Sequence, residues 1–218
     1  MSLFPDPQNS LSFPLPLAEK YRPRTIDAFI GLEKQRKVLS AFAKRPVSCA
    51  WLLIGGSGLG KTTMARALAE ELQADMHFIP SQQCNAETVQ NTWRLCWNIP
   101  LFGPSGWHVV IVDEADQCSN AAQLSLLSKL DSTSPAPSTI WVFTANACDR
   151  LEQRFLSRCR ILEFSSYGLR SELASFLAQV WKAETGADGK IDFERIAKDS
   201  ANNVRDALNT LEVELLAA

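Results

Sequence analysis

One stretch, from Trp51 to Leu72, constrains the fold of this 218-residue chain more than any other. A short apolar run at its start leads directly into the sequence Gly55-Gly56-Ser57-Gly58-Leu59-Gly60-Lys61-Thr62. These residues give the complete G-x-x-x-x-G-K-T pattern of a phosphate-binding loop. Beyond the loop, apolar residues recur at helical spacing. The pattern therefore predicts a buried strand, a phosphate-binding loop and a helix, in that order.

The chemistry of this loop follows from its residue types. Glycines let backbone N–H groups turn toward an anion, and the N-terminus of the next helix adds its positive dipole end. Lys61 is placed to reach the β- and γ-phosphates of a nucleotide, and the hydroxyl of Thr62 to hold Mg²⁺. Thr63 supplies the neighbouring hydroxyl. A glycine-rich turn with a chance lysine is the alternative, but the flanking strand and helix favour a nucleoside triphosphate site.

A second group of polar residues follows the apolar stretch from Trp107 to Val112, which is typical of a strand buried on both faces of a parallel sheet. The stretch ends in the sequence Asp113-Glu114-Ala115-Asp116. In open α/β sheets, ligands bind at the carboxyl ends of the strands. We therefore expect Asp113 to hold magnesium and Glu114 to polarise an attacking water molecule. An acid-rich helix start, which is common, is the alternative.

The stretch from Ile140 to Phe143 is the next predicted buried strand, and Thr144-Ala145-Asn146 follows it. An amide at this end of the strand would orient the water molecule between Glu114 and the γ-phosphate. This signal is weak when taken alone, because an asparagine after a strand usually caps a turn.

The order of the predicted elements indicates the fold class. Strands alternate with helices as far as Phe164, which predicts an α/β domain with a parallel sheet. From Tyr167 onward the strands stop, and three helical stretches predict a small helical lid. We therefore expect a proline-rich extended arm at 1–16, a nucleotide-binding α/β domain at 17–166 and a helical lid domain at 167–218. Periodicity does not give the order of the strands.

The leader, residues 17–30, contains the sequence Glu19-Lys20-Tyr21-Arg22-Pro23. Two interpretations are open. The leader packs on the core as a helical segment, or it forms the edge of a lid over the base of a nucleotide, with Tyr21 and Arg22 as the contacts.

The charge balance gives no overall signature of nucleic-acid binding, because the formal net charge is −2. Binding to DNA would need local groups of cations. Candidates near predicted helix ends are Lys34, Arg36, Lys37, Arg94 and Lys129. A solvated charged face is the alternative. Trp93 and Trp97 lie one helical turn apart, which is more typical of a core or interface pair than of a platform for base stacking.

Other classes of protein are disfavoured by composition. No apolar stretch approaches the roughly 18–20 residues of a membrane-spanning helix, and the N-terminus lacks the pattern of a secretory signal. We expect a cytoplasmic protein with reduced thiols, nucleoid-associated if the source is prokaryotic and nuclear if it is eukaryotic. The six cysteines form no C-x-x-C pair, and His77 and His108 match no zinc spacing. No zinc is therefore expected, and nucleotide-bound magnesium is the one metal predicted.

Several of these motifs occur together in one order. They are Glu19-Lys20-Tyr21-Arg22-Pro23, the phosphate-binding loop, Asp113-Glu114-Ala115-Asp116 with Asn120-Ala121-Ala122-Gln123, the strand ending at Asn146, Ser157-Arg158-Cys159 and Asn203-Val204-Arg205-Asp206-Ala207-Leu208-Asn209. Together they resemble the AAA+ ATPases of DNA-polymerase clamp loaders, especially the small subunits of replication factor C. The resemblance covers the chain from about Leu17 onward. It implies a P-loop AAA+ three-layer α/β domain followed by a helical lid.

The resemblance also implies residue roles. The residues of the phosphate-binding loop and the two acids keep the roles given above, and Asn146 becomes a sensor of the γ-phosphate. Arg158 would be an arginine finger, inserted into the site of a neighbouring subunit. Arg205, in the lid, would touch the nucleotide of its own subunit.

The implied activity is hydrolysis of ATP with Mg²⁺ in an oligomer of AAA+ subunits, with a sliding clamp and primer–template DNA as partners. A helicase loader, a recombination-associated motor and a non-hydrolysing partner subunit are the rivals; intact Lys61, Glu114 and Asn146 argue against the last. The sequence departs from the family where it stops without a helical collar, as either a fragment or a natural short form. It also lacks the cysteine cluster of bacterial clamp loaders. Its 80–105 region differs from the family pattern expected near DNA.

Overall fold

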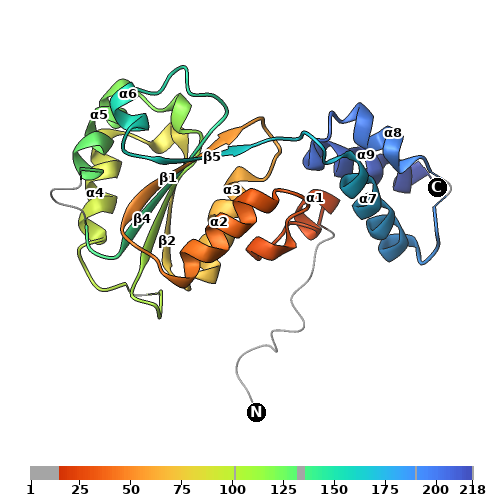
Figure 1. The fold of residues 1–218 in the computed structure, drawn as a ribbon, viewed down its shortest axis with the longest axis horizontal. Coiled ribbons are helices and arrows are strands. Elements are labelled where there is room, and N and C mark those ends of the chain that lie inside the picture. Colours follow the sequence, from red (N-terminus) through yellow and green to blue (C-terminus); the bar gives the residue numbers. More distant parts are fainter. Residues whose placement is uncertain (1–14, 101, 132–135, 190, 218) are drawn as a thin grey trace, which may run out of the picture.

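The computed structural model describes residues 15–100, 102–131, 136–189 and 191–217. Almost all of the predicted arm at 1–16 lies outside these residues. Figure 1 shows two parts, a sheet covered by helices and a group of helices that follows the last strand. Within the described ranges, no helix combines the length and the apolar character needed to cross a membrane.

Five parallel strands form one sheet in the order β2-β3-β4-β1-β5. Their bounds are β1 (Cys49–Gly55), β2 (Asp75–Ile79), β3 (His108–Val112), β4 (Thr139–Ala145) and β5 (Arg160–Phe164). The predicted α/β class with a parallel sheet is confirmed. Because the strands are parallel, the segments that follow β1, β3 and β4 all leave the same edge of the sheet, and these three strands are adjacent.

Helices cover the sheet, and the part of the molecule that follows the last strand, the lid, contains helices and no strand among the described residues. Those before the end of the sheet are α1 (Leu17–Lys20), α2 (Glu33–Lys44), α3 (Lys61–Glu71), α4 (Ala86–Leu95), α5 (Asn120–Lys129) and α6 (Gln153–Leu156), with 3₁₀ turns η2 (Ile26–Ala28), η3 (Ser81–Gln83) and η4 (Ala115–Gln117). The lid helices are α7 (Arg170–Thr185), α8 (Phe193–Asp199) and α9 (Val204–Ala217). The predicted change from α/β to all-helical structure therefore falls between Phe164 and Arg170.

Successive side chains of a strand point to opposite faces of the sheet, and this alternation divides the core into two layers. On β3, Val110 and Val112 pack with residues of α4, α5 and α6 on one face of the sheet. Val109 and Ile111 pack with residues of α2 and α3 on the other face. The sheet is therefore covered on both sides, which explains why its three central strands, β3, β4 and β1, are mostly apolar.

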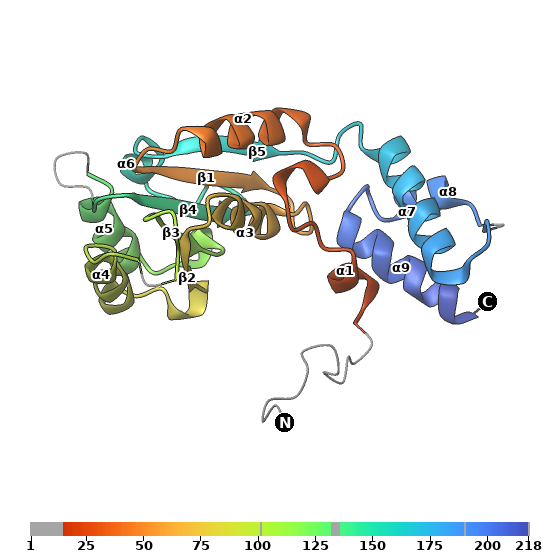
Figure 2. The same cartoon turned by 90° about the horizontal axis from the view of Figure 1, so that it is seen from below.

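The leader divides between the two parts of the molecule. Figure 1 and Figure 2 both place α1 beside α9, and Leu17 belongs to the buried cluster of the lid. Lys20 pairs with Glu184 of α7 at 2.8 Å between Nζ and Oε1. Ile26 and Phe29, by contrast, are buried in the α/β core with α2 and α3. The start of the leader therefore packs on the lid and its later part on the α/β core, so the interpretation of a helical leader that packs on the core holds for the later part.

Replacing Phe155 with alanine is expected to destabilise the α/β domain by about 3–5 kcal/mol, the usual cost of removing a large buried aromatic ring. Phe155 is fully buried, and its ring lies edge-on to Phe143 with 4.8 Å between centroids. Unfolding by urea measures the loss. The control is Phe102→Ala, because Phe102 is 85% exposed and its removal should change stability by less than about 0.5 kcal/mol. Equal effects of the two substitutions would contradict the prediction.

Candidate functional site

The loop after β1 turns tightly into α3. Two of its residues adopt backbone conformations with positive φ, which favour glycine. Gly58 has φ of 74° and Gly60, at the start of α3, has φ of 84°, so both lie in the left-handed region. A Cβ atom on Gly58 would also stand 2.1 Å from Oδ1 of Asn203, in the lid. The glycine at this position is therefore required by the loop conformation and by the close approach of the lid.

Lys61, the first residue of α3, has its ammonium group held by three acceptors. Its Nζ donates to the backbone oxygens of Gly55 and Gly56, each at 2.8 Å, and to Oδ1 of Asn146 at 3.0 Å. Burial lowers the pKa of Lys61, while the nearby charges of Asp116, Asp113 and Glu114 act in the opposite direction. A partly desolvated cation among backbone dipoles at a helix N-terminus is suited to bind an anion.

Thr62 and Asp113 meet beside this lysine. The Thr62 hydroxyl donates to Oδ1 of Asp113 at 2.6 Å, and the Thr144 hydroxyl, at the end of β4, donates to the same oxygen at 2.6 Å. Thr144 also accepts a hydrogen bond from the backbone N–H of Glu114 at 3.0 Å. Carboxylate and hydroxyl oxygens are the hard ligands that Mg²⁺ prefers, so this donor set fits that ion.

Glu114 and Asn146 complete the group at this edge of the sheet. Glu114 is exposed, has φ of 50°, and lies close enough for its charge to act on Lys61. The backbone N–H of Asn146 donates to Oδ1 of Asp116 at 3.4 Å, and Asp116 is buried. Asp116 thus positions the residue that holds Lys61. Asp116 belongs to the acidic motif, but the sequence predicts no role for it.

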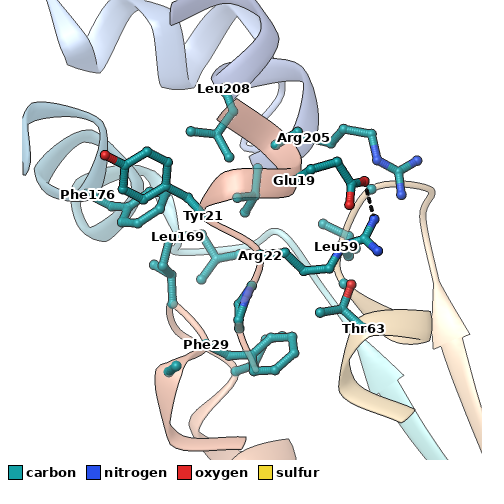
Figure 3. Close-up of a pocket in the computed structure, with 18 residues that line it drawn as sticks. Glu19, Tyr21, Arg22, Phe29, Leu59, Thr63, Leu169, Phe176, Arg205 and Leu208 are labelled. Carbon is teal, nitrogen blue, oxygen red and sulfur yellow. Dashed lines mark hydrogen bonds and ion pairs between the residues drawn. The ribbon is translucent and has the colours of Figure 1, made fainter. Parts of the chain in front are cut away.

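A pocket opens between the loop, the leader and the lid (Figure 3). Its walls include the side chains of Phe29, Leu59, Thr63, Arg22, Arg205 and Leu208. Arg22 pairs with Glu19 at 2.5 Å, the contact drawn as a dashed line in Figure 3. Apolar walls with two guanidinium groups at one side fit a ligand that is flat and apolar at one end and anionic at the other.

Tyr21 also borders this pocket, and its hydroxyl group donates to the Glu184 carboxylate at 2.5 Å. Its ring lies edge-on to Phe176 of α7, with 6.2 Å between centroids. Burial, with the hydrogen bond and the charge of Glu184, raises the pKa of Tyr21 to about 12. Tyr21 is therefore a neutral residue that ties the leader to the lid, and it is one of the residues that line the pocket.

Asn203, just before α9, was predicted only as part of a motif. Its Nδ2 donates to the backbone oxygen of Ser57 at 2.9 Å, and its Oδ1 accepts from the N–H groups of Arg205 and Asp206. One side chain therefore binds the phosphate-binding loop and caps a lid helix. The charge of Arg205 also acts on Lys61.

Arg158 lies elsewhere. It borders a different pocket, with Cys49, Thr139 and Trp141 among its lining residues, at the amino ends of β1 and β4. Its Nη1 donates to the backbone oxygen of Arg154 at 2.8 Å. Lys61 and Asp113 lie at the carboxyl ends of the strands, so the structure separates Arg158 from the site of its own chain.

Of the two tryptophans, Trp93 lies on α4 and Trp97 lies just beyond its end. Trp93 packs against the α/β core and lies edge-on to Trp97, with 5.4 Å between centroids. The ammonium group of Lys129 covers the Trp93 ring at 4.3 Å from its centroid. Trp93 therefore packs as the core interpretation expects, whereas Trp97 is 48% exposed.

Comparison with known proteins agrees with this geometry. The chain is 31% identical over 202 residues to replication factor C small subunit 1 of Pyrobaculum islandicum, a match that covers 89% of this chain and 60% of the relative. It is 30% identical over 210 residues to replication factor C subunit 4 of Saccharomyces cerevisiae, covering 93% of this chain and 64% of the relative. The chain thus spans less than two thirds of the length of these curated relatives.

Among solved structures, the RuvB Holliday junction branch migration motor of Thermotoga maritima superposes with a TM-score of 0.71 and 26% sequence identity, covering 88% of this chain and 64% of that one. The model of the ATPase family associated with various cellular activities matches residues 51–167, which include the phosphate-binding loop, both acids, Asn146 and Arg158. The chain therefore belongs to the ATPase family associated with various cellular activities (AAA), and it is similar to the small subunits of replication factor C.

Proposed function

We propose that this chain binds ATP with Mg²⁺ and hydrolyses it as one subunit of a clamp-loader-like AAA+ assembly. The observation that carries the proposal is the meeting of Lys61, Thr62, Asp113 and Asn146 at one edge of the sheet, with hydrogen bonds of 2.6 Å from Thr62 to Asp113 and 3.0 Å from Lys61 to Asn146. These residues come from three adjacent strands and their following segments. The reaction is phosphoryl transfer to water through positioning and charge stabilisation.

In this proposal each residue has one task. Lys61 binds the β- and γ-phosphates. To do so, its ammonium group exchanges its hydrogen bonds to the backbone oxygens of Gly55 and Gly56 for bonds to phosphate. Thr62 and Asp113 hold the magnesium ion, which when bound neutralises phosphate charge. Glu114 accepts a proton from the attacking water molecule, and Asn146 orients that molecule next to the γ-phosphate.

The pocket between leader and lid is proposed to take the base and sugar. Phe29 and Leu208 offer apolar surface, and the ring of Tyr21 adds to it. Arg22 and Arg205 are the cations among the residues that line this pocket (Figure 3). Because Arg205 belongs to the lid, its contact with phosphate would couple the position of the lid to the state of the nucleotide.

Arg158 is proposed to act in trans. It is exposed, and it stands at the amino edge of the sheet, away from Lys61 of its own chain. An arginine that is remote from its own site can stabilise the transition state only in a neighbouring subunit. The proposal therefore requires an oligomer, of this chain or with other AAA+ subunits.

The client is proposed from the relatives. Similarity to replication factor C subunits favours a sliding clamp on primer–template DNA. The likeness to RuvB favours a second candidate, a recombination-associated motor that acts on DNA junctions. Turnover of ATP by the assembly should rise with a sliding clamp and primed DNA in the first case, and with a four-way junction in the second. A helicase loader would respond to neither.

Direct contact with DNA is the weaker part of the proposal. Arg36 lies 3.9 Å from the Asp27 carboxylate, and Lys37 lies 3.4 Å from that of Glu33. Lys34, Arg94 and Lys129 remain the other candidate cations. Affinity for DNA should fall as salt rises, because phosphate contacts release bound counterions.

Replacing Lys61 with alanine tests the nucleotide site. The Kd for ATP is expected to rise about 10–100-fold, since a hydrogen bond to a charged group contributes about 1.5–3 kcal/mol. Fluorescence titration with a labelled ATP analogue measures the change. Native mass measurement with a limiting amount of a non-hydrolysable analogue should show less assembly of the variant alone than of the natural chain. The matched control is Lys182→Ala, on α7 and paired with Asp188. Unchanged ATP affinity in Lys61→Ala would overturn the site.

A further inference from the structure

Two histidines and one cysteine, distant in the sequence, meet beside the edge strand β2. His77 lies on β2, His108 is the first residue of β3, and Cys96 follows the last residue of α4. One ligand atom from each, a ring nitrogen or the sulfur, lies within 4.8 Å of the other two. We propose that His77, Cys96 and His108 form a binding site for one zinc ion. This site is separate from the proposed nucleotide site and does not depend on it.

The ligand atoms suit zinc. Imidazole nitrogen and thiolate sulfur are the ligand types that zinc sites combine, whereas magnesium and calcium prefer oxygen. Cys96 is 0% and His108 is 3% exposed, so the cluster is not a chance meeting of solvated side chains. His77 is half-buried. The fourth position of a tetrahedral ion is left for water, because no further His, Cys, Asp or Glu among the described residues belongs to this group.

The hydrogen bonds of His108 fix which of its nitrogens can bind a metal. Its Nε2 lies 2.9 Å from the backbone oxygen of Asn98, which only accepts, so Nε2 carries the proton. In the neutral ring, Nδ1 then offers a lone pair, and it lies 3.0 Å from Nε2 of His77. Metal-bound histidines usually donate their other N–H to a carbonyl or carboxylate in this way, which fixes the orientation of the ring.

The movement required is small. Two nitrogens bound to one tetrahedral zinc stand about 3.3 Å apart, because each Zn–N distance is about 2.0–2.1 Å. The His77 ring must therefore turn so that its lone pair and that of His108 point at a common ion. His77 is the ring able to do so, since it is half-buried on the outermost strand of the sheet.

Burial and the charge of Asp75 act on the cluster in opposing ways: both disfavour the Cys96 thiolate, whereas the charge of Asp75 favours a nearby cation. Burial raises the pKa of the Cys96 thiol to about 11, so zinc binding must release the thiol proton. Burial also lowers the pKa of His77, which keeps the ring in the neutral form that binds metals. The carboxylate of Asp75, on β2, acts on both side chains and offsets the positive charge that a zinc thiolate retains.

A zinc ion here would have a structural effect. It would join β2, β3 and the end of α4 near the amino ends of the strands, whereas Lys61 and Asp113 lie at the carboxyl ends. The segment between α4 and β3 carries the exposed side chains of Ile99 and Phe102. The ion would fix both ends of this segment on the sheet. The proposal replaces the expectation, drawn from sequence spacing, that the chain carries no zinc.

The test uses the full chain, purified under reducing conditions and freed of metal with a chelator. Zn²⁺ alone is titrated against a chromophoric chelator, and Co²⁺ alone is added as a spectroscopic probe. We expect one zinc per chain and a thiolate-to-cobalt charge-transfer band, which a site made only of oxygen ligands does not give. His77→Gln is expected to weaken zinc binding by more than about 100-fold, beyond the loss typical of removing an outer-shell partner.

Cys96→Ser should abolish the charge-transfer band, and Cys84→Ser is the matched control because Cys84 is also buried but lies outside the cluster. His77→Gln keeps the test valid if Cys96→Ser fails to fold, since His77 is only half-buried. Circular dichroism checks folding. Absence of stoichiometric zinc, or equal loss in Cys84→Ser and Cys96→Ser, would overturn the site. Zinc affinity unchanged in His77→Gln would also overturn it.

Discussion

Replacing Arg158 with alanine is expected to lower the turnover of ATP by the assembled protein about 10³–10⁵-fold, the range measured for arginines supplied by a neighbouring molecule. ATP affinity of the isolated chain should not change, because Arg158 lies at the amino edge of the sheet and Lys61 at the carboxyl edge. Steady-state phosphate release measures turnover, and titration with a labelled nucleotide measures affinity. Arg154→Ala is the matched control, since Arg154 is also exposed and lies one helical turn earlier.

Mixing two inactive variants gives the sharper test. In a homo-oligomer, Arg158→Ala chains keep an intact nucleotide site, and Lys61→Ala chains keep an intact arginine. An equimolar mixture should therefore recover turnover that neither variant has alone. If the mixture assembles, as shown by native mass measurement, yet remains inactive, Arg158 does not act in trans within an assembly of this chain.

Replacing Glu114 with glutamine is expected to lower turnover by about 10²–10⁴-fold, the usual contribution of a positioned general base. Affinity for ATP should remain, because the residues proposed to hold phosphate and magnesium are Lys61, Thr62 and Asp113. The N–H of Glu114 is fixed by the Thr144 hydroxyl at 3.0 Å, a contact of the backbone that glutamine preserves. Single-turnover assays with bound ATP separate chemistry from product release.

The control for this substitution is Glu71→Gln, which removes an exposed carboxylate from the end of α3. It changes the net charge equally and should leave turnover unchanged. Full activity in Glu114→Gln would remove Glu114 from the role of base. A large loss of ATP affinity would show instead that its charge supports the binding of magnesium.

The part of the site that could be predicted from sequence is the part carried by contiguous motifs. Lys61 and Thr62 follow a glycine pattern, and Asp113 and Asn146 each follow an apolar strand. Parallel strands bring such residues to one edge of the sheet, and the contacts from Thr62 to Asp113 and from Lys61 to Asn146 agree with that reasoning. The fold class followed from the same alternation of strands and helices.

Contacts that depend on the relative placement of elements could not be predicted. Thr144 bonds to Asp113 because β3 and β4 are neighbours, an order that periodicity does not contain. Asn203 reaches Ser57 from another part of the molecule. Likewise, His77 and His108 match no local metal spacing, because β2 and β3 bring them together through pairing rather than through a motif. Such contacts have no signature in a single sequence.

The division of the leader has a mechanical consequence. The chain passes between the two parts twice, once between α1 and η2 and again between β5 and α7. A body attached at one point can swivel in any direction, whereas attachment at two points favours rotation about the line that joins them. Pro23 stiffens the first crossing by fixing its φ. Rotation of the lid about that line would thus carry α1 with it.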